Sequence, residues 1–188
     1  MAVALALPHR FTVEDFERMV EAGILTKDDR VELIEGQVVE MSPIGKRHAS
    51  AVNRSTRLFV QRCGERATVS VQGPVQLVGT SQVQPDIALL RPREDFYREQ
   101  YPQVEDVLLI VEFADSSLLT DRNMKLPAYA AAGVPEVWLV NLPSDTVEIY
   151  REPSGGRYGR QDVVAEGGWL APLALPDLQV SAEELLSL

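Results

Sequence analysis

Three acidic residues lie inside or beside apolar runs that have the pattern of β-strands, and their placement constrains the fold strongly. Glu32 lies within Val31-Glu32-Leu33-Ile34, Asp86 opens the run Asp86–Leu90, and Glu112 lies near the end of Val107–Phe113. A carboxylate in such a position is costly unless another group compensates its charge. If folding brings two of these carboxylates to about 4 Å, they repel by roughly 4 kcal/mol at an effective dielectric constant near 20. A divalent cation would remove this penalty, so the pattern indicates a metal-dependent enzyme.

The bulk composition is that of an ordinary globular protein. The 188 residues, of which 45% are hydrophobic and 24% charged, suffice for one domain with a sizeable core, and we predict a single domain over residues 1–188. One cysteine, Cys63, excludes an internal disulfide and fits a reducing compartment. The apolar run Ala2–Leu7 is too short for a signal peptide, and no apolar stretch approaches a membrane span of about 20 residues. We therefore expect a cytoplasmic protein with no membrane partner.

The net charge of −10 argues against a broad, non-specific nucleic-acid-binding surface. It leaves room for a local basic groove. The expected helix Lys46–Cys63 carries Arg47, Arg54 and Arg57, which are candidates for contacts with backbone phosphates. A solvated helix surface explains these arginines equally well.

Sequence patterns predict helices at Val13–Ala22, Lys46–Cys63 and Thr120–Ala132, with a short helix near the C-terminus. Thr12 and Asp15 are placed to begin the first helix, and Ser181 with Glu184 forms a capping box for the last. Strands are predicted at Val31–Ile34, Gln37–Met41, Ala67–Gln72, Val75–Val78, Asp86–Leu90, Val107–Phe113, Glu136–Asn141 and Thr146–Arg151. The first two and the last two strands read as hairpins. Together these elements indicate an α/β or α+β sandwich.

Each acid also has an ordinary explanation when it is taken alone. Period-two alternation places Leu108, Ile110 and Glu112 on one face of their strand, yet Glu112 could be an exposed acid at the strand end. Asp86 could cap a turn after Pro85. Glu32 could pair with an arginine on a neighbouring strand.

Lys125 and His48 complete the set of candidate residues. Three of the 18 basic residues are lysines, so arginine is the usual surface cation of this chain. A lysine on the helix after Glu112 differs from arginine because it can lose a proton. It could instead pair with Asp121 on a solvated face, and Asp121 could also position the amine. His48, at a loop-to-helix junction, could relay a proton or bind phosphate, or could be a surface histidine.

The order of these motifs resembles a known family. Pro85-Asp86 followed by Glu112 is similar to the Pro-Asp…(Asp/Glu)-x-Lys signature of restriction-endonuclease-like phosphodiesterases. More narrowly, about residues 10–151 resemble the Uma-type family of putative restriction endonucleases. The matching stretches are Val31–Gly36, Met41–His48, Gln84–Ala88, Val111–Ser117, Asp121–Lys125 with Tyr129, and Ala132–Trp138. The usual lysine position, two residues after Glu112, is Ala114 here, and the resemblance assigns this role to Lys125.

The resemblance implies a restriction-endonuclease-like fold, a mixed central β-sheet flanked by helices with additional hairpins. It implies an endonuclease that hydrolyses phosphodiester bonds in nucleic acid, with DNA as the expected substrate. Mg²⁺ or Mn²⁺ would be bound by Asp86, Glu112 and Glu32, and Lys125 and His48 would also be catalytic. We expect a homodimer, because cleavage of a duplex favours two active sites. The alternatives are a nuclease-like binding module that does not cut, and an oligomeric structural or interaction protein in which these charges form an internal ion-pair network.

Overall fold

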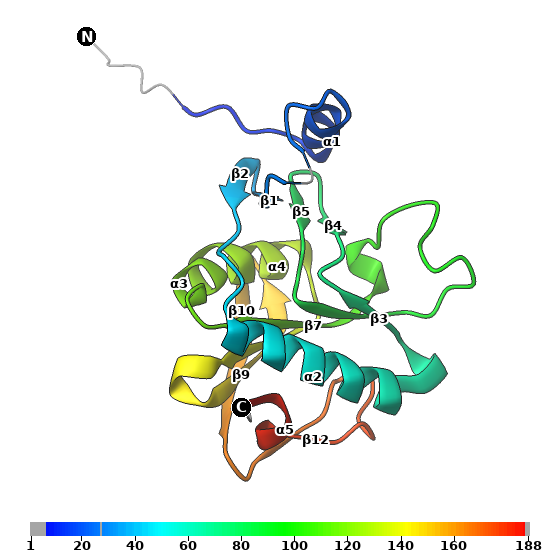
Figure 1. Cartoon of the computed structure of the whole chain (residues 1–188), viewed down its shortest axis with the longest axis vertical. Helices are drawn as coiled ribbons and strands as arrows, with labels where there is room; N and C mark the ends of the chain where they lie inside the picture. Colours follow the sequence, from blue (N-terminus) through cyan, green and yellow to red (C-terminus); the bar gives the residue numbers. More distant parts are fainter. Residues whose placement is uncertain (1–6, 27, 187–188) are drawn as a thin grey trace.

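The larger of two main β-sheets is the centre of the fold (Figure 1). The computed structural model describes residues 7–26 and 28–186. The six strands have the order β10-β9-β8-β7-β6-β3. They are β3 (Thr68–Val71), β6 (Ile87–Leu90), β7 (Val107–Ala114), β8 (Glu136–Asn141), β9 (Thr146–Ser154) and β10 (Arg157–Ala165). Strands β7 and β8 are parallel and the other neighbours are antiparallel, so the sheet is mixed.

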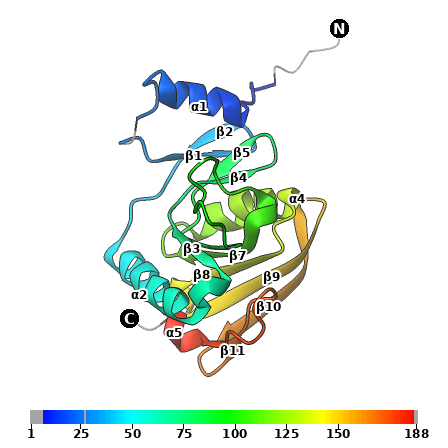
Figure 2. The same ribbon diagram turned by 90° about the vertical axis from the view of Figure 1, so that its right-hand side faces the viewer.

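Helices cover both faces of this sheet (Figure 2). On one face, α2 (Lys46–Cys63) and α5 (Ala182–Leu186) pack against the sheet, and Phe59 and Leu185 share a core with Trp138. On the other face lie α3 (Leu118–Thr120), a π-helical turn over Asp121–Lys125, and α4 (Leu126–Ala132). Every residue of β7 and β8 is buried, as expected for strands that are covered on both faces.

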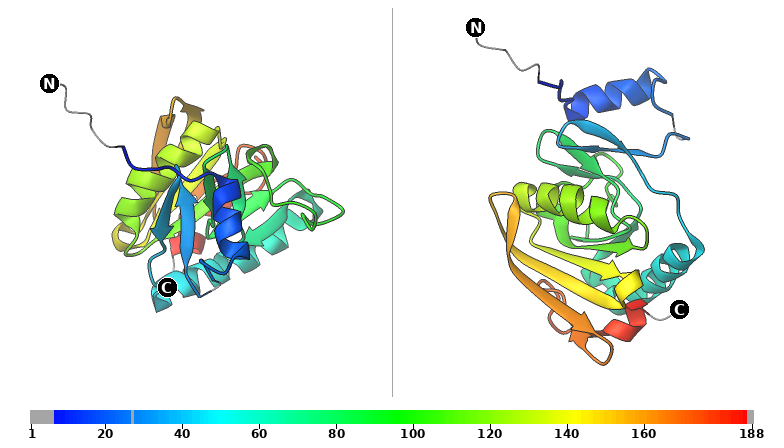
Figure 3. Two further views of the ribbon diagram at one scale, coloured as in Figure 1. Left: turned by 90° about the horizontal axis from the view of Figure 1, so that it is seen from above. Right: turned by 90° about the vertical axis from the view of Figure 1, so that its left-hand side faces the viewer.

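A second, four-stranded sheet lies on the α4 side of the larger sheet, with α1 beyond it (Figures 2 and 3). Its order is β2-β1-β5-β4. These elements are α1 (Val13–Glu21), β1 (Val31–Ile34), β2 (Gln37–Glu40), β4 (Val75–Leu77) and β5 (Ser81–Val83). Glu35 and Gly36 turn between β1 and β2 with φ angles of 48° and 74°. A Cβ atom on Gly36 would lie 2.9 Å from the Phe11 carbonyl, so this position requires glycine.

The chain ends in a small hairpin and α5. The hairpin pairs β11 (Trp169–Leu170) with β12 (Val180–Ser181). Glu184 Oε2 accepts the Ser181 N–H at 2.9 Å, and Ser181 Oγ accepts the Glu184 N–H at 3.3 Å. The predicted capping box is confirmed.

Most predicted elements are confirmed, including the mixed sheet flanked by helices, both hairpins and the capped first helix. The first helix ends at Glu21, one residue before its predicted end. Strand β5 was not predicted, because three residues are too few to show a period of two. The predicted run Ala2–Leu7 lies, apart from Leu7, outside the described residues. No helix in the described part of the chain is long and apolar enough to cross a membrane.

Two local irregularities correct the predicted geometry near the site. Leu89 pairs with Leu109, but Leu90 pairs with Val107, so Leu108 forms a bulge with no partner on β6. As a result, Leu108 packs in the core on one face of the sheet and Ile110 packs in the core on the other face. The prediction that Leu108 shares a face with Glu112 is therefore wrong.

The predicted helix Thr120–Ala132 is interrupted by the π-helical turn Asp121–Lys125. The N–H of Leu126 bonds to the Asp121 carbonyl, five residues earlier. Pro127 follows at once, and proline lacks an N–H and crowds the preceding turn. The proline therefore gives a physical reason for the local change in helix type.

Candidate active site

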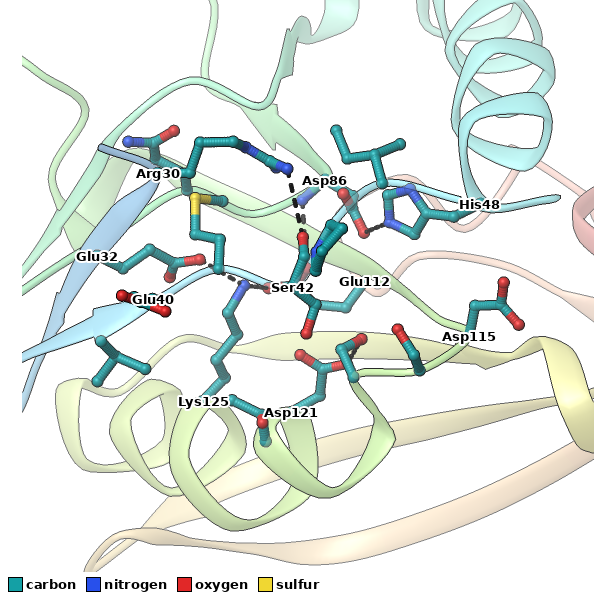
Figure 4. A pocket seen from close by; sticks show the side chains of 18 of the residues that line it. Arg30, Glu32, Glu40, Ser42, His48, Asp86, Glu112, Asp115, Asp121 and Lys125 are labelled. Carbon is teal, nitrogen blue, oxygen red and sulfur yellow. Dashed lines mark hydrogen bonds and ion pairs between the residues drawn. The ribbon is translucent and has the colours of Figure 1, made fainter. Parts of the chain in front are cut away.

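A hollow of about 770 Å³, counting the part that is open to solvent, lies where the small sheet meets the larger one (Figure 4). Strands β1 and β2, the start of α2, the residue before β6, the end of β7 and the helical segment after β7 contribute to its walls. Its acidic lining residues are Glu32, Glu40, Asp86, Glu112, Asp115 and Asp121, and its basic ones are Arg30, His48 and Lys125. The excess of acids makes the hollow a favourable place for a cation.

Asp86 lies immediately before β6, and its two carboxylate oxygens have different hydrogen-bond partners. Oδ2 accepts the Phe113 N–H at 2.9 Å and lies 2.8 Å from His48 Nε2. Oδ1 accepts a longer bond of 3.3 Å from the Gln72 side-chain amide. The carboxylate is thus anchored through Oδ2, and Oδ1 is the less constrained oxygen.

Lys125 lies between two buried carboxylates. Its Nζ is 3.1 Å from Glu112 Oε1 and 3.0 Å from Glu32 Oε1. The Tyr129 hydroxyl also donates to Glu112 Oε1, at 2.6 Å. Glu112 Oε2 accepts a longer bond of 3.3 Å from the Asp86 N–H. Two strong donors therefore anchor Oε1, and Oε2 is the less constrained oxygen, as Oδ1 is in Asp86.

Burial and neighbouring charges shift the pKa values of this group. Burial alone would lower the pKa of Lys125, but Glu112 and Glu32 outweigh it and raise this pKa above its ordinary value. Burial raises the pKa of Glu112, Lys125 opposes this, and Asp86 adds to the increase. Burial, with Glu112 close by, also raises the pKa of Tyr129, so its hydroxyl remains a donor. These neighbours favour a permanently charged Lys125 over the removable proton that the sequence suggested.

His48 contacts Asp86 from the first turn of α2. The hydrogen bond to Asp86 raises the pKa of His48, and burial of the ring opposes this effect. His48 Nδ1 is buried and has no hydrogen-bond partner among the described residues. The ring also meets Phe113 edge-on, with centroids 6.5 Å apart. His48 is therefore not a surface histidine, and its Nε2 is engaged by a site acid.

Asp121 and Lys125 both lie in the π-helical turn, and both are buried. The alternative that they pair on a solvated face is therefore wrong. The Ser117 hydroxyl donates to Asp121 Oδ2 at 2.7 Å. Burial raises the pKa of Asp121, and Lys125 and the Ser117 bond oppose this. Irregular π turns of this kind are frequent at functional sites.

The donor atoms suit a hard divalent cation in part. Carboxylate oxygens are the ligands that Mg²⁺ prefers, and Asp86 Oδ1 and Glu112 Oε2 are the least constrained oxygens of their groups. Glu32 Oε2 is buried without a hydrogen-bond partner in the described part of the chain. Among residues 7–26 and 28–186, however, no three His, Cys, Asp or Glu side chains group closely enough to hold a metal ion. Water or substrate oxygens would have to complete the coordination, as is usual for Mg²⁺.

The three arginines proposed to contact nucleic acid lie in different surroundings. Arg47 is the second residue of α2, next to His48, and it pairs with Asp145 at 3.1 Å. Arg57 is exposed, about 15 Å further along the helix at 1.5 Å per residue. Arg54 instead donates to the Glu184 and Leu185 carbonyls, both at 3.4 Å. It thus ties α2 to the C-terminal helix.

The hollow brings together all five predicted catalytic residues, Glu32, His48, Asp86, Glu112 and Lys125. Sequence reasoning did not assign a role to two further groups, Tyr129 and Gln72. Tyr129 follows Lys125 by four residues, so helical periodicity already places both on one face. Gln72 carries no such signal, since its contact with Asp86 depends on how β3 and β6 pair.

Comparisons with known proteins agree with this architecture. A crystal structure of a putative nuclease belonging to DUF820 from Anabaena variabilis superimposes with a TM-score of 0.70 at 16% sequence identity. The match covers 94% of this chain and 98% of that one, and at this identity it shows a shared fold. None of the curated proteins matches the sequence. The family model for Uma2, described as putative restriction endonuclease, matches residues 13–183. The chain therefore belongs to the Uma2 family of restriction-endonuclease-like proteins.

Proposed function

We propose that this protein is a metal-dependent endonuclease that hydrolyses phosphodiester bonds in nucleic acid, with DNA as its substrate. The observation that carries the proposal is the convergence of Asp86, Glu112 and Lys125, which come from three separate segments, in one hollow. The Uma2 family and the nuclease-like fold support a nuclease-like function. We also propose that residues 1–188 act as one domain, since one apolar cluster joins both sheets.

In this proposal Asp86 and Glu112 hold Mg²⁺ or Mn²⁺. Glu32 forms an ion pair with Lys125, which compensates its negative charge. When bound, the ion would lower the pKa of a water molecule and neutralise charge on the scissile phosphate. His48 and the Phe113 N–H fix the Asp86 carboxylate. Lys125 orients the attacking water or stabilises the negative charge on the phosphoryl oxygens in the pentacovalent transition state.

Nucleic-acid contacts are proposed along the exposed side of α2. Arg47 lies nearest to the hollow, and Arg57 extends the same helix. Both would bind backbone phosphates, which position a duplex without reading its sequence. Arg54 is assigned a structural role because backbone carbonyls of the C-terminal helix accept its hydrogen bonds.

Conservative substitutions of the two acids test the proposal. Asp86→Asn and Glu112→Gln keep the shape of each side chain and should abolish Mg²⁺- or Mn²⁺-dependent cleavage of plasmid and linear DNA. Asp177→Asn is the control, because Asp177 is an exposed acid that pairs with Arg66 outside the hollow, and an exposed pair contributes little to stability. It should keep the wild-type rate. Equal cleavage by wild type, Asp86→Asn and Glu112→Gln would refute the mechanism.

A nuclease-like binding module that does not cut is the second candidate. The charged Lys125 already compensates Glu32 and Glu112 without a metal ion, which favours this alternative. Titration calorimetry with Mn²⁺ separates the two functions. Metal binding that Asp86→Asn abolishes supports the nuclease. DNA binding without Mn²⁺ binding or cleavage supports the binding module.

A further inference from the structure

Strand β10 is an open edge of the larger sheet, and in the right-hand view of Figure 3 it lies, in orange, at the outer margin. It has nine residues, whereas β3 at the opposite edge and β2 in the small sheet have four each. It contains neither lysine nor proline, two residues that commonly protect exposed edges from pairing. Within the described part of the chain, no further strand pairs with its outer side.

The charges on β10 are arranged so that the strand is complementary to itself. Arg160 and Asp162 lie on the same face, with Nε and Oδ2 2.7 Å apart, and their side chains are 53% and 42% exposed. An antiparallel pairing centred on Gln161 would place Arg160 of one copy opposite Asp162 of the other. Two-fold symmetry makes this contact twice. Opposite charges that face each other across a strand pair stabilise it, and like charges destabilise it.

The same register suits the neighbouring residues. Gln161 would face Gln161 of the second copy, and two side-chain amides can donate to and accept from each other. Val163 is 60% exposed, which leaves apolar surface at the edge. In this pairing it would face Gly159 of the second copy, where no side chain obstructs it.

We propose that two copies of this chain associate through β10, antiparallel and centred on Gln161, to form one continuous twelve-stranded sheet. The interface is isologous, since each copy contributes the same strand. It lies at the far edge of the sheet from β6 and so leaves the hollow of each copy open. The proposal gives the expected homodimer a surface and a register, and it does not depend on nuclease activity.

Charge exchange across the proposed axis tests this register. Wild-type protein should show a mass approaching twice 20.8 kDa as its concentration rises in sedimentation equilibrium. Arg160→Asp places like charges opposite each other at both symmetric contacts. It should raise the dissociation constant of the dimer by roughly tenfold or more. Asp162→Arg should do the same. The double variant with both changes restores opposite charges and should restore the dimer.

The exposed Arg160–Asp162 pair contributes little to the stability of the monomer, so each variant should remain folded. Circular dichroism will check this. Hydrogen exchange gives a second measurement: amides of residues 160–164 should become more protected as the wild-type concentration rises. A wild-type protein that remains monomeric at high micromolar concentration would overturn the proposal. So would a dimer that the single substitutions do not weaken, or one that the double variant fails to restore.

Discussion

Replacing Tyr129 by phenylalanine would remove one hydroxyl from the site and keep the aromatic ring in its place. Tyr129 is fully buried and donates to Glu112 Oε1 over 2.6 Å. A hydrogen bond to a charged acceptor contributes about 1.5–3 kcal/mol. Tyr129→Phe should therefore lower the free energy of unfolding by about that amount. At about 2–4 °C for each kcal/mol in a chain of this size, the melting temperature should fall by about 3–12 °C.

Tyr158→Phe is the matched control for this measurement. The Tyr158 hydroxyl donates to the Val134 carbonyl at 2.9 Å, and this acceptor is neutral. Its loss should cost about 0.5–1.5 kcal/mol. Equilibrium unfolding in urea measures both variants at about pH 9, because burial raises the pKa of Glu112 to about 8 and the carboxyl is mostly ionised only above that value. If Tyr129→Phe costs no more than Tyr158→Phe, Glu112 is not the charged, anchored acceptor that the site argument requires.

The same variant separates anchoring of Glu112 from simple stability. Without the Tyr129 hydroxyl, Lys125 alone would hold Oε1, and the carboxylate could turn away from a bound ion. Groups that orient a metal ligand typically change metal affinity by about 10–100-fold. Calorimetry should therefore show weaker Mn²⁺ binding for Tyr129→Phe and unchanged binding for Tyr158→Phe. If wild type and Tyr129→Phe bind Mn²⁺ equally, Tyr129 does not orient the ligand.

Two further predictions concern charges. Lys125→Met should lower the free energy of unfolding by about 3–5 kcal/mol, because it leaves the buried Glu32 and Glu112 uncompensated. A decrease of less than about 1 kcal/mol in urea unfolding would contradict this prediction. Hydrogen bonds from Arg62 lower the pKa of Glu184, so its stabilising effect is present above the ordinary glutamate pKa and is lost as the pH falls through the lowered value. Glu184→Gln should therefore destabilise the protein near neutral pH, and this effect should shrink as the pH falls below the ordinary glutamate pKa of about 4.3. Unfolding titrations can test this, and a pH-independent difference would argue against it.

The sequence alone determined the local elements, because their signals are local. Nearly continuous apolar runs predicted β7 and β8, and cap residues such as Thr12 and Ser181 marked where helices begin. The three acids beside strands, with Lys125 on the following helix, were recognisable as one candidate set. Because burying an uncompensated charge is costly, an acid within an apolar strand run indicates a special role before any fold is known.

Tertiary structure decided which groups meet. The bulge at Leu108 depends on pairing with β6, and the π turn depends on how the chain accommodates Pro127 while Asp121 and Lys125 stay buried. Arg54 resembled its neighbours in sequence, but the C-terminal helix, about 130 residues away, accepts its hydrogen bonds. Contacts between distant segments depend on strand order and register, which no local pattern encodes.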